Sequence, residues 1–188
     1  MNTDTTHETL VTGGTGKTGR RVAQRLRDRG IAVRLGSRAG QPPFDWDDRA
    51  TWGPALAGVD AVYLAYAPDL AVPGAAETVG AFAGQAVESG ARRIVLLSGR
   101  GEPEAQQAEK AVTAAAPGAT VLRCSFFAQN FSESFLAGPV RAGEVMLPVD
   151  TVPEPFVDAD DIADVAAAAL TEDGHVGEVY ELTGPRLL

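Results

Sequence analysis

A glycine-rich stretch near the amino terminus has the residue types and spacing of a phosphate-binding turn. Residues 12–19 read TGGTGKTG and lie between a short apolar run and an amphipathic helical pattern. Gly13 permits a sharp turn after a strand, Gly16 lets a pyrophosphate approach the backbone, and Gly19 lets the helix pack closely. The helix would direct its free N–H groups and positive dipole end at the phosphates. The residues predicted to bind a dinucleotide here are Gly13, Thr15, Gly16, Lys17, Thr18 and Gly19.

The end of the second apolar run carries the chemistry that separates two nicotinamide cofactors. In NAD-specific sites, an Asp or Glu about 20 residues after the turn binds the ribose 2′-hydroxyl. The corresponding residues here are Gly36, Ser37 and Arg38, and none is a carboxylate. A hydroxyl and a guanidinium can both bind a 2′-phosphate. The sequence therefore predicts NADP(H) in preference to NAD(H), with Lys17 as a second positive charge near that phosphate.

Strand and helix patterns alternate along the chain, and these elements must position the residues named above. Runs of consecutive apolar residues are typical of strands buried on both faces, and patterns of period 3.6 indicate the helices between them. Strand patterns occupy residues 9–12, 31–35, 61–65, 93–97, 120–123 and 179–182. A short strand or the remnant of one is expected at 44–46, and a short strand near 156. Helical patterns begin near residue 16 and occupy 48–57, 74–90, 103–116, 125–137 and 162–169.

This alternation predicts an α/β fold with a doubly wound parallel sheet of the Rossmann type. No linker or change in composition divides residues 1–188, so we expect one domain. The ligand of such a sheet lies outside the carboxyl ends of the strands, at the point where the strand order reverses. The further residues predicted to contact the cofactor at this edge are Ser37, Arg38, Asp45, Trp46, Ala65, Tyr66, Ser98 and Phe126.

The composition limits the partners and the compartment. A formal net charge of −9 argues against direct nucleic-acid binding, and no apolar run reaches the roughly 18–20 residues that span a bilayer. Residues 1–8 are polar, unlike a signal peptide, and are predicted to be flexible. The single cysteine, Cys124, fits a reducing compartment, and the isolated His7 and His175 indicate no metal site. We therefore expect a cytoplasmic protein without metal, nucleic-acid or membrane partners.

Four segments, taken in order, resemble the NmrA-like, atypical short-chain dehydrogenase/reductase family. Residues 12–19 match its TGxxGxxG turn, and residues 44–48 (FDWDD) are similar to its segment near the adenine. Residues 121–130 (VLRCSFFAQN) resemble its segment beside the nicotinamide, and residues 156–163 (FVDADDIA) resemble its late FVDxxDIA element. The resemblance covers almost the whole chain, and it implies an NAD(P)-binding oxidoreductase.

The chain departs from the family pattern in two ways. Short-chain dehydrogenases usually place a catalytic tyrosine four residues before a lysine, but Gln106 stands at that distance before Lys110. An amide cannot replace the phenolic proton donor. Relatives usually continue beyond a segment like residues 182–185, whereas this sequence stops at Leu188. We therefore expect a substrate lobe that is either minimal or truncated.

Three side chains are candidates for catalysis, and each also has a structural interpretation. Ser98 ends a central strand and could bind a substrate carbonyl, or it could cap the following loop. Lys110 could bind the nicotinamide ribose, as the family's lysine often does, or it could be a solvated helix residue. Tyr66 follows a strand and could donate a proton, or it could stack on the cofactor or pack against neighbouring residues.

An aromatic-rich segment follows the strand pattern at 120–123. Phe126, Phe127, Phe131 and Phe135 could form the floor of an apolar pocket for a planar substrate such as a quinone. The alternative is that they form the buried face of a helix. The sequence leaves both interpretations open.

Two hypotheses about function follow. The first is an NADP(H)-dependent oxidoreductase that transfers hydride to a small carbonyl or quinone-like acceptor. The second is a regulator without turnover that senses NADP(H) and acts through a protein partner; the missing tyrosine keeps it open. A homodimer is a further assembly compatible with either hypothesis.

Overall fold

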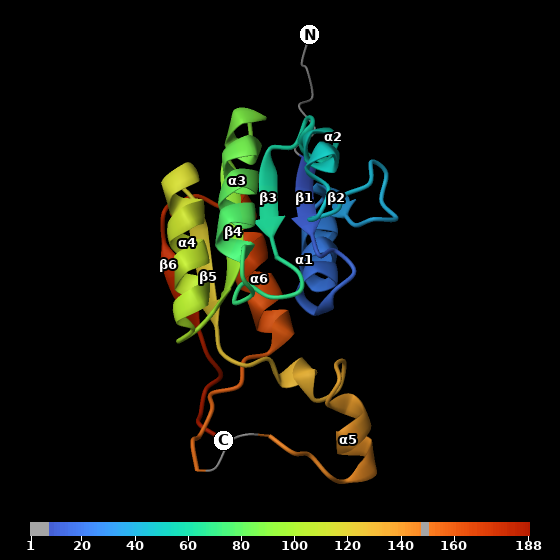
Figure 1. Cartoon of the computed structure of the whole chain (residues 1–188), viewed down its shortest axis with the longest axis vertical. Coiled ribbons are helices and arrows are strands. Elements are labelled where there is room, and N and C mark those ends of the chain that lie inside the picture. Colours follow the sequence, from blue (N-terminus) through green and yellow to red (C-terminus); the bar gives the residue numbers. More distant parts are fainter. Residues whose placement is uncertain (1–7, 148–150) are drawn as a thin grey trace.

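A parallel sheet forms the centre of the molecule (Figure 1). The computed structural model describes residues 8–147 and 151–188, in which six strands have the order β2-β1-β3-β4-β5-β6. The order reverses between β1 and β3, which confirms the predicted doubly wound α/β class. Of the segment predicted to be flexible, residues 1–7, His7 included, lie outside the described residues. The strands are β1 (Glu8–Thr12), β2 (Ala32–Gly36), β3 (Ala61–Leu64), β4 (Arg93–Gly99), β5 (Thr120–Cys124) and β6 (Val179–Leu182).

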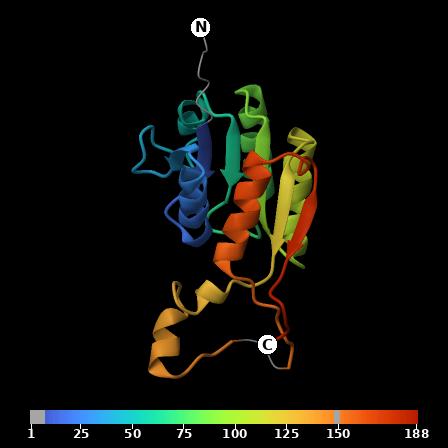
Figure 2. The ribbon, with the colours of Figure 1, turned by 180° about the vertical axis from the view of Figure 1, so that it is seen from behind.

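Helices cover both faces of the sheet. Helices α3 (Ala75–Glu88) and α4 (Pro103–Ala115) lie on the face seen in Figure 1, and α1 (Lys17–Asp28) and α6 (Ala159–Thr171) lie on the face seen in Figure 2. No helix in the described residues is long and apolar enough to cross a bilayer. The short elements are η1 (Arg49–Thr51), α2 (Trp52–Leu56), η2 (Ala128–Asn130) and α5 (Ala137–Ala142).

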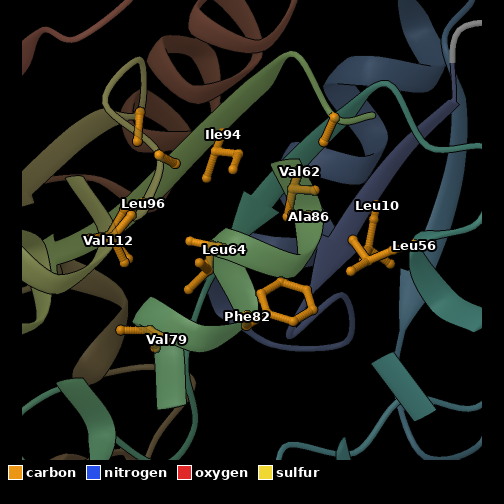
Figure 3. Packing of buried hydrophobic residues seen from close by; sticks show 14 of the residues in the cluster. Leu10, Leu56, Val62, Leu64, Val79, Phe82, Ala86, Ile94, Leu96 and Val112 are labelled. Atoms are coloured by element: carbon orange, nitrogen blue, oxygen red, sulfur yellow. The ribbon is translucent and has the colours of Figure 1, made fainter. Parts of the chain in front are cut away.

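Two apolar clusters, one on each face, hold the layers together. In β3, Val62 and Leu64 pack toward α3 and α4, whereas Ala61 and Tyr63 pack toward α1 and α6. Figure 3 shows the cluster on the α3 and α4 face, in which the ring of Phe82 lies among aliphatic side chains such as Leu56 and Leu64. Fully burying one such large side chain contributes about 1.5–3 kcal/mol before entropy is counted. Burial on both faces is why the strands read as continuous apolar runs.

One local prediction is wrong, and another is met only in its weaker form. Residues 125–137 do not form one helix: the chain is extended through Phe127, forms η2, and becomes helical again only in α5. The backbone of this segment forms hydrogen bonds with Val157 instead of within a helix. The N–H of Val157 donates to the carbonyl of Phe126, and its carbonyl accepts from the N–H of Ala128. At residues 44–46 the structure has the remnant rather than the strand, because Asp45 makes only an isolated bridge to Asp48. Tertiary hydrogen bonds override the local pattern in the first case.

The segment that contains η2 and α5 extends beyond the carboxyl ends of the strands, as both views show (Figures 1 and 2). Ion pairs fasten it to the main body. The Nη2 atom of Arg21 lies 2.8 Å from Oε1 of Glu133, and its Nε atom lies 3.0 Å from Oδ2 of Asp160 in α6. Arg20 also pairs with Glu133. One arginine of α1 thus joins this segment to α6.

We predict that these ion pairs make stability depend on pH. Arg21 and Arg20 lower the pKa of Glu133 from 4.5 to about 2. Because the folded pKa is depressed, the stabilisation is present above the ordinary pKa and is lost as the pH falls toward about 2. Glu133→Gln should therefore lower the urea midpoint near neutral pH, and the difference from the parent chain should shrink in acid.

Glu144→Gln provides the matched control, because Glu144 is exposed and forms no ion pair with any residue of the described ranges. Its urea midpoint should follow the parent chain at every pH. A Glu133→Gln difference that is the same at neutral and acidic pH would contradict the proposed titration.

Candidate dinucleotide-binding site

The glycine turn has a conformation that side chains would prevent. Gly13 has a φ of +60°, a left-handed conformation that favours glycine, and its carbonyl accepts a hydrogen bond of 2.8 Å from the N–H of Gly16. A Cβ on Gly19 would lie 2.2 Å from the Gly13 carbonyl oxygen. The absence of a side chain at Gly19 therefore lets the helix pack closely against the backbone of the glycine turn. Helix α1 begins at Lys17, with Gly16 as its N-cap residue.

Thr12 fixes this turn to the neighbouring strand, and the sequence argument missed its role. Its hydroxyl accepts a hydrogen bond of 2.8 Å from the N–H of Ala65 and lies 3.1 Å from the carbonyl oxygens of both Tyr63 and Ala65. These contacts join the ends of β1 and β3, between which the strand order reverses. The sequence signal that could have revealed this contact is a threonine directly after an apolar strand pattern, because a hydroxyl that becomes buried there requires a partner.

The first turn of α1 is suited to an anion. It has no side-chain cap and no acidic residue, and it is the only helix of twelve or more residues in the described ranges whose first turn lacks an acid. Thr15 and Gly16 are exposed, and Lys17 is half-buried. A bound phosphate would therefore meet unpaired N–H groups and no competing carboxylate. This geometry fits the pyrophosphate of a dinucleotide.

The end of β2 lies beside the turn, because Gly36 pairs in register with Thr12. Ser37 is half-buried, and its carbonyl accepts hydrogen bonds of 2.9 Å from Gly40 and Phe44. Arg38 is exposed and forms no ion pair within the described part of the chain. Its guanidinium is thus free to pair with an anion near the turn.

The aromatic residues predicted near the cofactor pack against one another. The rings of Trp46 and Tyr66 are 5.0 Å apart, and Trp46 also lies 5.0 Å from Phe82 in the core. The carbonyl of Asp45 accepts a hydrogen bond from Trp52 Nε1, and its carboxylate accepts one from the N–H of Asp47. Tyr66 therefore has the packing contact that one interpretation predicted. Its catalytic role stays a prediction.

A buried polar network, consisting of Ser98, Glu109 and Arg123, lies behind the end of β4. Ser98 Oγ donates a 2.6 Å hydrogen bond to Oε1 of Glu109, and Arg123 contacts both Glu109 oxygens at 2.6–3.0 Å. The hydrogen bonds between Arg123 and Glu109 raise the pKa of Arg123. The Ser98 hydroxyl is therefore already used within the protein, and its catalytic role stays a prediction.

Glu109 is a residue that sequence reasoning missed, although the signal is present. Ala105, Ala108, Glu109 and Val112 follow one another at helical spacing, and all four are buried. A carboxylate on the buried face of a helix requires a partner. Lys110, the predicted catalytic lysine, is instead exposed, so Glu109 is the α4 side chain that reaches Ser98.

A second carboxylate lies at the end of β4. Glu102 packs against Gly99 so closely that a Cβ on Gly99 would lie 2.3 Å from Oε2 of Glu102. Partial burial and the nearby Asp69 and Glu104 carboxylates raise the pKa of Glu102. A carboxyl that retains its proton more readily than an ordinary glutamate therefore lies at this edge.

The aromatic segment beyond β5 forms a small cluster that is not the buried face of a helix. The Phe126 ring lies 6.0 Å from the rings of Phe131 and Phe156, and Phe126 is 40% exposed. Phe127 packs against the core under α6, and Phe135 is 77% exposed. The four phenylalanines named in the sequence therefore do not form one floor.

The fold, together with the glycine turn and the uncapped first turn of α1, is that of a Rossmann-type nucleotide-binding protein. No family model matches the chain. It is 32% identical over 207–212 aligned positions to agroclavine dehydrogenases of Claviceps, covering 95% of the chain and 68% of the Claviceps fusiformis protein. It is 35% identical to an uncharacterized oxidoreductase of Bacillus subtilis, with 95% and 66% covered. Its fold matches an NADPH-dependent quinone oxidoreductase of Escherichia coli complexed with NADPH (TM-score 0.74, 23% identity, 96% and 70% covered).

The chain therefore belongs to the NmrA-like, atypical short-chain dehydrogenase/reductase family, as the sequence motifs indicated. This is a family of NAD(P)-binding oxidoreductases with a Rossmann fold. The chain spans about two thirds of the length of these curated relatives, 66% and 68% in the two cases.

Proposed function

We propose that this protein is an NADP(H)-dependent reductase that passes hydride to a small carbonyl or quinone-like acceptor. The observation that carries the proposal is the first turn of α1, which is uncapped and free of acidic residues beside a glycine turn that leaves the backbone accessible. The dehydrogenase and oxidoreductase names of the relatives support the reaction class, and the Escherichia coli quinone oxidoreductase supports the acceptor class.

In this proposal each part of the site has a separate task. The α1 N-terminus binds the pyrophosphate, and Lys17 adds a positive charge beside it. Ser37 and Arg38 bind the 2′-phosphate. The bound nicotinamide supplies the hydride, so the protein's task is to position the acceptor and exclude competing reactions. Ser98, Lys110 and Tyr66 remain the predicted catalytic residues, although no contact brings the three together.

We predict that Arg38→Asp weakens NADPH binding at least about tenfold more than NADH binding, because hydrogen bonds to charged groups contribute about 1.5–3 kcal/mol. Dissociation constants for both cofactors, measured by calorimetry, would test this. Arg27→Asp makes the same charge change at the opposite end of α1 and should alter neither affinity. Equal losses for NADPH and NADH in Arg38→Asp would overturn the assignment of Arg38.

The second hypothesis, a regulator that senses NADP(H) and acts through a protein partner, is favoured by the surroundings of the three candidate catalytic side chains. Ser98 is bound to Glu109, Lys110 is exposed, and Tyr66 packs on Trp46. NADPH oxidation measured with a panel of quinones and aldehydes separates the two hypotheses. Turnover supports the reductase, whereas different affinities for oxidised and reduced cofactor without turnover on any acceptor support the regulator.

A further inference from the structure

We propose that Glu109 is a positioning residue for the nicotinamide half of the dinucleotide. Through its bonds to Ser98 and Arg123 it holds the ends of β4 and β5 together, and it acts on the cofactor through them rather than by contact. This inference rests on the proposed function, because it assumes that a dinucleotide binds along the carboxyl edge of the sheet.

One carboxylate joins three elements. Glu109 comes from α4, Ser98 from β4 and Arg123 from β5, and the strand residues Ser98 and Arg123 are direct partners in the parallel ladder. The Glu109 side chain is only 6% exposed, whereas that of Arg123 is 29% exposed. Both oxygens of the carboxylate are occupied, since Oε1 accepts from Ser98 and both accept from Arg123.

The network lies one residue before the strands end. The next pair in the ladder is Gly99 and Cys124, after which the N–H of Arg100 donates to the carbonyl of Cys124 at 2.9 Å. Beyond it, the hydroxyl of Ser125 is buried and has no hydrogen-bond partner among the described residues. Any displacement of β4 against β5 at the network would therefore move the backbone at the carboxyl edge.

The position of this edge identifies the part of the ligand concerned. The strand order is β2-β1-β3-β4-β5, and the pyrophosphate would lie on the turn after β1. The adenosine half extends toward β2, where Ser37 and Arg38 lie, so the other half extends past β3 toward β4 and β5. The Glu109 network therefore supports the nicotinamide side and leaves the adenosine side alone.

The choice of a buried ion pair supports a positioning role. A well-packed apolar pair of the same volume would hold α4 on the sheet at least as well, because desolvation opposes the attraction of buried charges. Hydrogen bonds to a carboxylate are directional, because each donor must approach a defined oxygen, and an apolar contact lacks this property. Ser98 and Arg123 are thereby fixed in orientation as well as in distance.

The test compares two ligands on the full chain. NADPH contains both halves of the dinucleotide, and 2′,5′-ADP contains only the adenosine half. Glu109→Gln should weaken NADPH severalfold, reaching about tenfold if the full loss of one charged hydrogen bond is transmitted to the nicotinamide half. It should leave the dissociation constant of 2′,5′-ADP within about twofold. Calorimetry gives both constants, and the fluorescence of bound NADPH reports the nicotinamide environment directly.

Three variants sharpen the test. Ser98→Ala keeps the Glu109 and Arg123 ion pair, so it should fold and show a smaller but equally selective loss of NADPH affinity. Arg123→Lys retains a charged donor and should recover part of the affinity that Arg123→Met loses. Glu88→Gln removes the same charge from the exposed end of α3 and should change neither constant.

The outcomes separate this inference from the proposed function. Equal weakening of both ligands in Glu109→Gln and in Ser98→Ala would show a general structural role and overturn the positioning role. Unchanged NADPH affinity in both variants would also overturn it. If the parent chain binds neither ligand, the proposed function fails, and the inference fails with it.

Discussion

Gly19→Ala is expected to destabilise the protein by about 3 kcal/mol, at the upper end of the cost of overpacking a close contact. The new Cβ would lie 2.2 Å from the carbonyl oxygen and 2.7 Å from the carbonyl carbon of Gly13. Both atoms are backbone, so no side-chain rotation can relieve the overlap, and α1 must move away from the turn. The free energy of unfolding in urea measures the cost, and NADPH titration should show the accompanying loss of affinity.

Gly84→Ala is the matched control, because it makes the same substitution inside a helix with room for the methyl group. The nearest atom to a Cβ on Gly84 is the Ala115 Cβ at 3.7 Å, an ordinary contact. Alanine favours the helix by up to about 1 kcal/mol, so this variant should be more stable than the parent. A Gly19→Ala protein as stable as Gly84→Ala would show that the turn does not need glycine at 19.

Arg123→Met is expected to cost about 3 kcal/mol, near the lower end of the range for breaking a buried ion pair. The methionine removes the guanidinium and leaves the buried Glu109 carboxylate with only the Ser98 hydroxyl as a donor. Arg123 is partly exposed, so water can replace some of the lost interaction. Chemical unfolding at neutral pH measures the change in the free energy of unfolding.

A neighbouring arginine provides the comparison for this substitution. Arg100 pairs with Glu181 at 3.1 Å, and the two side chains are 43% and 54% exposed. Exposed ion pairs contribute at most about 1 kcal/mol, so Arg100→Met should be nearly neutral. If Arg123→Met and Arg100→Met lower the free energy of unfolding by the same small amount, the buried Glu109 carboxylate does not need Arg123. The Glu109 and Arg123 ion pair would then contribute no more than an exposed one.

Parts of the site could be predicted because their interactions are local in sequence. Gly13 and Gly19 are six residues apart and determine each other's contacts through the turn and first helical turn. The continuous apolar strands likewise predicted a parallel sheet, since each strand must be apolar on both faces to lie between two helix layers. The resemblance of the four ordered segments was sufficient to identify the family, which the relatives then confirmed.

The residues that the sequence argument missed depend on pairs far apart in the chain. Thr12 bonds to Ala65, Ser98 to Glu109, and Arg21 to Glu133, across 53, 11 and 112 positions. The predicted helix over 125–137 was wrong for the same reason, because Val157 takes its backbone hydrogen bonds. The pattern of a single sequence shows which local structure a segment favours. It does not show which distant group will form hydrogen bonds with that segment's backbone or side chains.

The sequence by itself thus determined the glycine-rich turn, the alternation of strands and helices, and the absence of an acid after β2. Each follows from residue type and short-range spacing, which is enough to fix backbone conformation and which faces are apolar. Only the tertiary structure decided that Glu109 rather than Lys110 reaches Ser98, and that Arg21 joins the segment beyond the sheet to α6. The rotation of a helix on the sheet and the pairing of distant charges depend on packing all the layers together.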